Sequence, residues 1–188
     1  MNNNTKNRIF LTGVACVGKT TIGKSLALLL NKSFFDLDIE VENFFGTTIE
    51  RLQKECLTMY TFRCEVAKAL SHFLDKPESI DCVISLMPSG LMGPGFRAIK
   101  NFGGGISIVL EDTSENILKR ITFYDIDSKL ITVRLNDRKK LSYLYSIEDN
   151  IKYFEASYKK ADFHVDISGL NIKEATLKVK EVISKNPS

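Results

Sequence analysis

Tryptophan and long apolar runs are both missing from this chain of 188 residues. No apolar stretch approaches the roughly 20 residues that a membrane-spanning helix needs. The polar start "MNNNTKN" lacks the apolar centre of a signal peptide, so a flexible tail is expected over 1–7. Lys and Arg outnumber Asp and Glu by only 26 to 23, which gives no sign of nucleic-acid binding. We therefore expect a cytoplasmic protein that binds neither a membrane nor nucleic acid.

The cysteines also lack the spacing of a zinc or redox site, because no two of them form C-x-x-C. Free, buried thiols in a reducing compartment are the expected state. The four residues are Cys16, Cys56, Cys64 and Cys82.

Short apolar runs separated by helical patterns predict an α/β fold in which helices cover a parallel sheet. The length and a hydrophobic content of 44% suit one domain over 1–188. A helix is expected from about Lys140 to Lys159, and a closing helix over the apolar face of "NIKEATLKVKEVI". The expected strands are "RIFLTG" from Arg8, "SFFDLD" from Ser33, "DCVISLM" from Asp81, "GISIVL" from Gly105 and "DFHVDI" from Asp162.

The run "GVACVGKT", from Gly13 to Thr20, matches the pattern G-x-x-x-x-G-K-[ST] of a phosphate-binding loop, or P-loop. Backbone N–H groups of such a loop bind phosphate oxygens, which the following helix N-terminus also attracts. Gly13 and Gly18 accept backbone angles that other residues resist. Lys19 would place a cation at the β- and γ-phosphates, and Thr20 would offer its hydroxyl to Mg²⁺.

The context of this loop favours a nucleotide site over a chance glycine turn between a strand and a helix. An apolar strand precedes it, and apolar residues at helical spacing follow it at Ile22, Leu26, Leu29 and Leu30. We expect ATP to be held by Gly13, Val14, Ala15, Cys16, Val17, Gly18, Lys19, Thr20 and Thr21.

Two carboxylates follow in "FFDLDIEVENFFGTTI". Asp36 and Asp38 would share one side of an extended chain and point into the crevice at the carboxyl end of a parallel strand. One of them would hold Mg²⁺, and the other would position or deprotonate a substrate hydroxyl. The alternative is a pair of turn residues that cap a helix starting near Ile39.

The stretch 122–140, "TFYDIDSKLITVRLNDRKK", interrupts the alternation of strands and helices. Its charges are mixed and its periodicity is weak. It is expected to be a lid that closes over reactants and excludes water, or else an ordinary solvated connection.

At this point the chain resembles the shikimate kinase family, and the resemblance covers nearly its whole length. The matching features are the P-loop, the Asp-x-Asp after "FF", Gly46 followed by Thr48 and Ile49, and "FR" at Phe62 and Arg63. The resemblance implies a three-layer α/β/α fold with a five-stranded parallel sheet and a lid. It also implies transfer of the γ-phosphate of MgATP to the 3-hydroxyl of shikimate, in aromatic amino-acid biosynthesis.

The resemblance assigns a role to each matching residue. Lys19 and Thr20 match the phosphate lysine and the Mg²⁺ hydroxyl, and Asp36 matches the carboxylate near the metal. Asp38 matches the residue that binds the ring hydroxyls and, with Lys19, carries catalysis. Arg63 matches the arginine that pairs with the substrate carboxylate, although an arginine on an amphipathic helix is more often solvated.

Several positions depart from the family. Met87, Pro88 and Ser89 stand where the family has three glycines near the substrate, so the acceptor pocket is expected to differ. Phe154 replaces an arginine, which removes a second contact to the carboxylate, and Cys16 replaces a P-loop glycine. The family's lid arginine falls near Lys129, with Arg134 and Arg138 as possible substitutes.

These departures leave three readings open. The first is a divergent shikimate kinase, expected to act as a monomer on a small-molecule substrate. The second is a P-loop kinase for another sugar acid or small alcohol. The third is a nucleotide-binding protein without kinase activity.

Overall fold

The computed structural model describes residues 7–127, 129–133 and 135–185. Its main sheet has five parallel strands in the spatial order β2-β3-β1-β4-β7. The strands are β1 (Ile9–Thr12), β2 (Ser33–Asp36), β3 (Cys82–Ser85), β4 (Ile106–Glu111) and β7 (Phe163–Asp166). All five strands expected from the sequence are present, so the predicted α/β fold with a five-stranded parallel sheet is confirmed.

The central strands are apolar because both faces of the sheet are covered. Every residue of β1 is buried, and alternate side chains enter different cores. Ile9 and Leu11 belong to the core on one face, whereas Phe10 packs into the core on the other. A strand with two buried faces reads as a continuous apolar run rather than as an alternating pattern.

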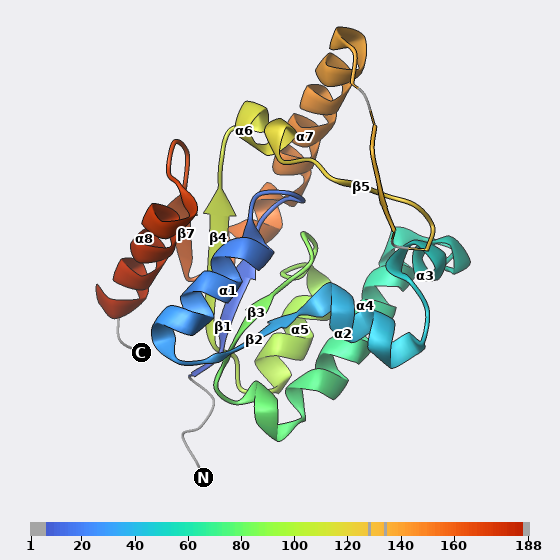
Figure 1. The fold of residues 1–188 in the computed structure, drawn as a ribbon. Coiled ribbons are helices and arrows are strands. Elements are labelled where there is room, and N and C mark those ends of the chain that lie inside the picture. Colours follow the sequence, from blue (N-terminus) through green and yellow to red (C-terminus); the bar gives the residue numbers. More distant parts are fainter. Residues whose placement is uncertain (1–6, 128, 134, 186–188) are drawn as a thin grey trace.

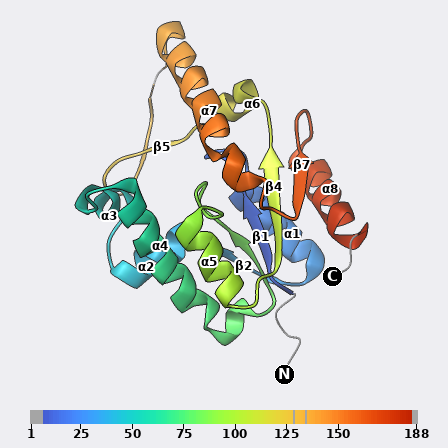
Figure 2. The ribbon, with the colours of Figure 1, turned by 180° about the vertical axis from the view of Figure 1, so that it is seen from behind.

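Helices form a layer on each face of the sheet (Figures 1 and 2). Helices α1 and α8 pack against each other on one face, and α4 and α5 pack together on the opposite face. The helices are α1 (Lys19–Leu30), α2 (Leu37–Phe45), α3 (Ile49–Glu55), α4 (Met59–Leu74), α5 (Gly93–Asn101), α6 (Ser114–Lys119), α7 (Asp137–Tyr158) and α8 (Ile172–Lys185), with a short 3₁₀ turn η2 (Pro77–Ser79).

The segment 122–140 contains a small antiparallel hairpin that the sequence analysis missed. Strand β5 (Phe123–Tyr124) pairs with β6 (Leu130–Ile131), and α7 begins at Asp137 rather than near Lys140. In Figure 1 the hairpin extends away from the main sheet toward α3. The expected tail over 1–7 lies outside the described residues except for Asn7.

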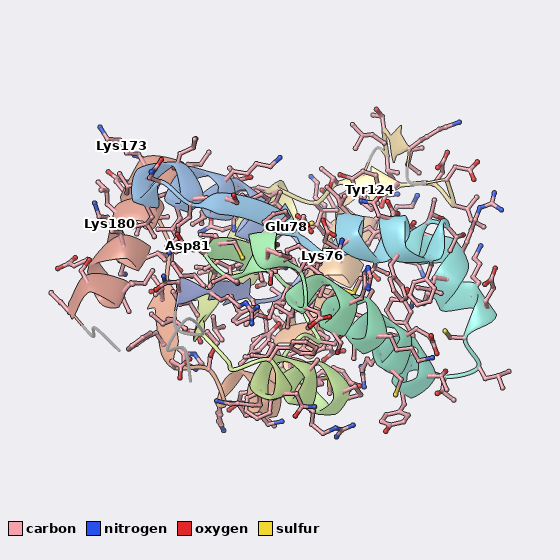
Figure 3. All side chains as sticks on the ribbon, turned by 90° about the horizontal axis from the view of Figure 1, so that it is seen from below. Lys76, Glu78, Asp81, Tyr124, Lys173 and Lys180 are labelled. Atoms are coloured by element: carbon pink, nitrogen blue, oxygen red, sulfur yellow. The ribbon has the colours of Figure 1, made fainter. Side chains whose placement is uncertain are left out.

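A buried arginine ties the amino ends of the strands together. Arg8 is only 5% exposed, and its guanidinium donates to the carbonyl oxygens of Ser79, Phe102 and Leu74 at 2.6–2.7 Å. Figure 3 views this end of the sheet, where charged side chains such as Lys76, Glu78 and Asp81 surround η2. Arg8 therefore acts as an internal clamp beneath a charged surface.

Replacing Arg8 by methionine is expected to lower the free energy of unfolding by about 3 kcal/mol, because buried carbonyl groups lose a charged donor. Urea denaturation of the purified protein measures this change. Arg97→Met, at an exposed position of α5, is the control and should change stability by less than about 0.5 kcal/mol. Equal stability of the two variants would contradict the clamp.

All four cysteines are free, as expected, but only Cys82 is buried. Burial raises the pKa of the Cys82 thiol to about 12, which keeps it protonated and unreactive. Cys16, Cys56 and Cys64 are half-buried, so the expectation of buried thiols is wrong for them. Within the described ranges, no helix is both long and apolar enough to span a bilayer.

Candidate active site

The P-loop lies between β1 and α1, at the carboxyl end of the sheet. Gly13 has a φ of 139°, and a Cβ at this position would lie 2.6 Å from the carbonyl oxygen of Leu110. Gly18 has a φ of 115° and is the N-cap of α1. Cys16 has a φ of 61°, a left-handed conformation that favours glycine. The loop thus has, at Cys16, a backbone conformation that is typical of glycine.

Lys19 folds back over this loop. Its Nζ donates to the carbonyl oxygens of Gly13 and Val14 at 3.0 and 2.9 Å. Burial lowers the pKa of Lys19, while the charges of Asp38 and Asp36 partly offset that effect. The structure therefore brings a desolvated cation to the loop, beside both of the acidic residues that the sequence singled out.

Thr20 and Asp36 come together across 16 residues of sequence. The Thr20 hydroxyl donates to Asp36 Oδ2 at 2.7 Å. A hydroxyl next to a carboxylate suits Mg²⁺, which prefers oxygen ligands and often binds through one carboxylate, a hydroxyl and substrate phosphates. The described residues contain no group of three or more His, Cys, Asp or Glu that would hold a metal without such phosphates.

The position of Asp38 corrects the sequence analysis. Strand β2 ends at Asp36, and α2 starts at Leu37, so Asp38 lies in the first turn of a helix rather than on an extended chain. Asp36 is the N-cap, and its Oδ1 accepts a hydrogen bond from the Asp38 backbone N–H at 3.2 Å. The capping reading is therefore correct for Asp36, and the helical turn still keeps both carboxylates near Lys19.

The carboxyl group of Asp38 has a strongly altered affinity for protons. Its pKa is raised to about 6, first by desolvation in the crevice and then by the charge of Asp36. Lys19 acts in the opposite direction. At pH 7 the carboxylate form still prevails, so Asp38 is available to accept a proton from a neighbouring hydroxyl.

Arg63 projects from the second turn of α4, where its neighbour Phe62 is buried in the core. Its Nη2 donates to the hydroxyl of Tyr153 in α7 at 2.6 Å, and its Cζ lies 5.6 Å from the centre of the Tyr153 ring. Among the described residues, its buried Nε has no acceptor. Tyr153 is a potential functional residue that the sequence did not indicate, because 90 residues separate it from Arg63.

Three of the departures from the family line a mostly apolar cavity of about 330 Å³ that lies between the P-loop and α7. Its lining includes Ala15, Cys16, Pro88 and Phe154. Met87 is 6% exposed and fills part of the core on the α4 and α5 face. Apolar side chains therefore lie beside the P-loop at these positions.

Arg120 is a second residue that sequence reasoning missed. Its Nε donates to the carbonyl oxygen of Cys16 at 3.2 Å, and its Nη2 forms an ion pair with Asp112. It thereby adds a cation at the P-loop from the end of α6. The link spans 104 residues of sequence, and neither residue carries a local motif that would have revealed it.

Two of the three expected lid cations lie among the described residues. Lys129 lies in the β5–β6 hairpin and Arg138 in the first turn of α7. Neither side chain forms a hydrogen bond or ion pair with another residue in the described part of the chain. Arg134 lies outside the described residues. The hairpin itself is held to α3 by other groups, since Thr48 donates to the carbonyl oxygen of Ile126 at 2.7 Å.

An exposed ion pair adds to this attachment, because Arg51 Nη2 lies 2.6 Å from Asp127 Oδ1. Asp127→Asn is expected to speed amide hydrogen exchange over 122–133 several-fold, since the hairpin loses a charged contact. Global stability should change by less than about 1 kcal/mol, because exposed pairs contribute little. Exchange measured by mass spectrometry tests this, with Asp137→Asn as the control. Unchanged exchange over 122–133 would refute the attachment.

The parallel sheet, the glycine loop and the paired carboxylates define a P-loop protein of the kinase type. A family model described as "Shikimate kinase" matches residues 15–184. The chain belongs to the shikimate kinase family, whose members are phosphotransferases that use ATP and an alcohol group as acceptor.

Individual relatives agree with this assignment. The chain is 30% identical over 182 residues to the shikimate kinase of Buchnera aphidicola, covering 96% of this chain and 98% of that protein. It is 26% identical over 182 residues to the shikimate kinase of Clostridium botulinum, covering 96% and 99%. A solved structure of shikimate kinase from Acinetobacter baumannii in complex with shikimate has a TM-score of 0.76 and 24% identity, and covers 98% of this chain and 96% of that one. That structure supports the fold.

Proposed function

We propose that this protein transfers the γ-phosphate of MgATP to the 3-hydroxyl of shikimate. The observation that carries the proposal is the convergence of Lys19, Thr20, Asp36 and Asp38 at the carboxyl end of the sheet. Family membership supports the same activity. The relatives named above are shikimate kinases, and the solved structure from Acinetobacter baumannii is a complex with shikimate.

In the proposed mechanism, the chain mainly positions the reactants and neutralises charge. The P-loop N–H groups and Lys19 bind the phosphates, and Lys19 stabilises the charge that develops on the transferred group. Thr20 and Asp36 would hold Mg²⁺, which neutralises phosphate charge when bound. Asp38 orients the attacking hydroxyl and accepts its proton, while Arg63 binds the carboxylate of the substrate.

A second acceptor remains a candidate because of specific residues. Phe154 gives the region beside the P-loop an apolar side chain where the family has an arginine, and Met87 and Pro88 stand in place of glycines. These changes favour an acceptor that needs fewer charged contacts than shikimate. A small alcohol without a carboxylate would meet this condition, and another sugar acid would meet it if Arg63 alone held its carboxylate.

A coupled ADP-release assay separates the candidates. Purified protein with MgATP is expected to release ADP when shikimate is added, and mass spectrometry should show one phosphate on the product. Release only with another sugar acid or alcohol would reject shikimate as the acceptor. ATP binding without release across the panel would favour a nucleotide-binding protein without kinase activity.

The remaining expectations follow from the same proposal. We place the enzyme in the cytoplasm, where its four free thiols would stay reduced. It would act as a monomer with small-molecule partners, because each residue proposed for the reaction comes from this one chain. Size-exclusion chromatography with light scattering tests the oligomeric state.

A further inference from the structure

We infer that Tyr153 supplies the second contact to the substrate carboxylate, in the role that the arginine missing at position 154 leaves open. This inference rests on the proposed function. It makes Tyr153 a specificity-determining residue that acts together with Arg63.

The hydrogen bond between Arg63 and Tyr153 can have only one direction. An arginine can only donate, so the Tyr153 hydroxyl oxygen accepts from Arg63 Nη2 at 2.6 Å. The O–H proton of Tyr153 is then left to donate to another acceptor. A tyrosine polarised in this way by a cation is a stronger donor to a carboxylate than an isolated hydroxyl.

Arg63 has more donors than the bond to Tyr153 needs. A guanidinium carries five N–H donors, and the bond to Tyr153 uses one of them. The Nε of Arg63 is buried and has no acceptor among the described residues. Because Nε is closed to solvent, a carboxylate arriving beside Tyr153 would instead bind the Nη protons of Arg63 that the bond to the hydroxyl does not use.

Contacts with neighbouring side chains hold the Tyr153 ring in place. The Cζ atom of Arg63 lies over the Tyr153 ring, 5.6 Å from its centre, and this ring meets Phe154 edge-on with centroids 5.0 Å apart. Phe154 in turn stacks on Tyr158 at 5.8 Å. The aromatic side chain at position 154 therefore supports the tyrosine beside it. Tyr153 is still 54% exposed, so its side chain is open to a ligand.

Tyr153→Phe tests the inference, because it keeps the ring and removes only the hydroxyl. The KM for shikimate is expected to rise about tenfold, while kcat and the KM for ATP change by less than about twofold. With the methyl ester of shikimate, whose carbonyl oxygen is only a neutral acceptor, the same substitution should have a smaller effect, of about threefold or less. Tyr145→Phe, at an exposed position of the same helix, is the matched control and should behave as the wild type.

A double-mutant cycle with Arg63→Lys, measured through the KM for shikimate, distinguishes a contact to the substrate from a purely structural role of Tyr153. The effect of Tyr153→Phe should largely vanish in the Arg63→Lys background, since the two donors act on one carboxylate. An unchanged KM for shikimate in Tyr153→Phe, or a lower one, would overturn the inference; a lower value would mean that the hydroxyl competes with the carboxylate. Failure of the wild-type protein to phosphorylate shikimate would instead reject the proposed function, and the inference with it.

Discussion

Lys19→Met is expected to lower the rate of shikimate-dependent ADP release about a thousandfold or more. The side chain of Lys19 is the cation that the P-loop holds over its own carbonyl oxygens, 2.9 and 3.0 Å away. Methionine has a similar shape but carries no charge, so the transferred phosphoryl group loses its stabilising contact. A coupled assay at saturating MgATP and shikimate measures the loss.

The fold should survive this change. Burial lowers the pKa of Lys19, so its ammonium form is disfavoured in the folded protein, and removal of the charge offsets the loss of its two hydrogen bonds to the loop. The thermal unfolding midpoint of Lys19→Met should therefore stay close to that of the wild type. Lys24→Met, on an exposed part of α1, is the control and should keep normal activity. Substantial residual turnover in a folded Lys19→Met protein would reject the assigned role.

The sequence could predict the parts of this site that depend on local pattern. The P-loop is encoded in eight consecutive residues, and the buried strand β1 precedes it directly. Gly13 and Gly18 were recognisable because their positive φ angles demand glycine within a fixed spacing. The central strands β1, β3 and β4 were visible because both faces of the sheet are covered there, which makes each one an apolar run.

At the start of α2, the local sequence pattern gave a wrong prediction. Asp36 ends β2 and also caps α2, so the alternation that seemed to place Asp36 and Asp38 on one strand stops between them. The two carboxylates are still near each other, but a helical turn and a capping hydrogen bond bring them together. An Asp that ends a strand and caps a helix gives no sequence signal that separates the two roles.

The remaining parts depend on contacts between distant segments. Tyr153 meets Arg63 across 90 residues, and Arg120 meets the P-loop across 104. The hairpin of β5 and β6 is held to α3 by Thr48 and Arg51, although its own sequence has weak periodicity. Such contacts arise from the packing of whole elements, and no single stretch of residues predicts them.

Asp38→Asn is expected to lower kcat by about a hundred- to ten-thousandfold, because an amide cannot accept the proton of the attacking hydroxyl. The wild-type enzyme should also lose kcat/KM for shikimate as the pH falls through about 6, where Asp38 becomes protonated. Rate profiles between pH 5 and pH 8 measure this limb. Glu40→Gln, in the same turn of α2, is the control and should keep the wild-type profile.

Protonation of Asp38, which should lower activity, should raise the stability of the folded protein. Its pKa is about 6 in the folded protein and 3.8 without the shift, so its contribution to stability is fully present below about pH 4 and is lost as the pH rises through 6. Asp38→Asn does not titrate, and it should therefore gain stability over the wild type as the pH rises from 4 to 7. Thermal unfolding across this range tests the sign. The opposite result would be an inactive Asp38→Asn whose stability, relative to the wild type, falls between pH 4 and pH 7. That result would show that Asp38 is a structural carboxylate rather than a desolvated catalytic one.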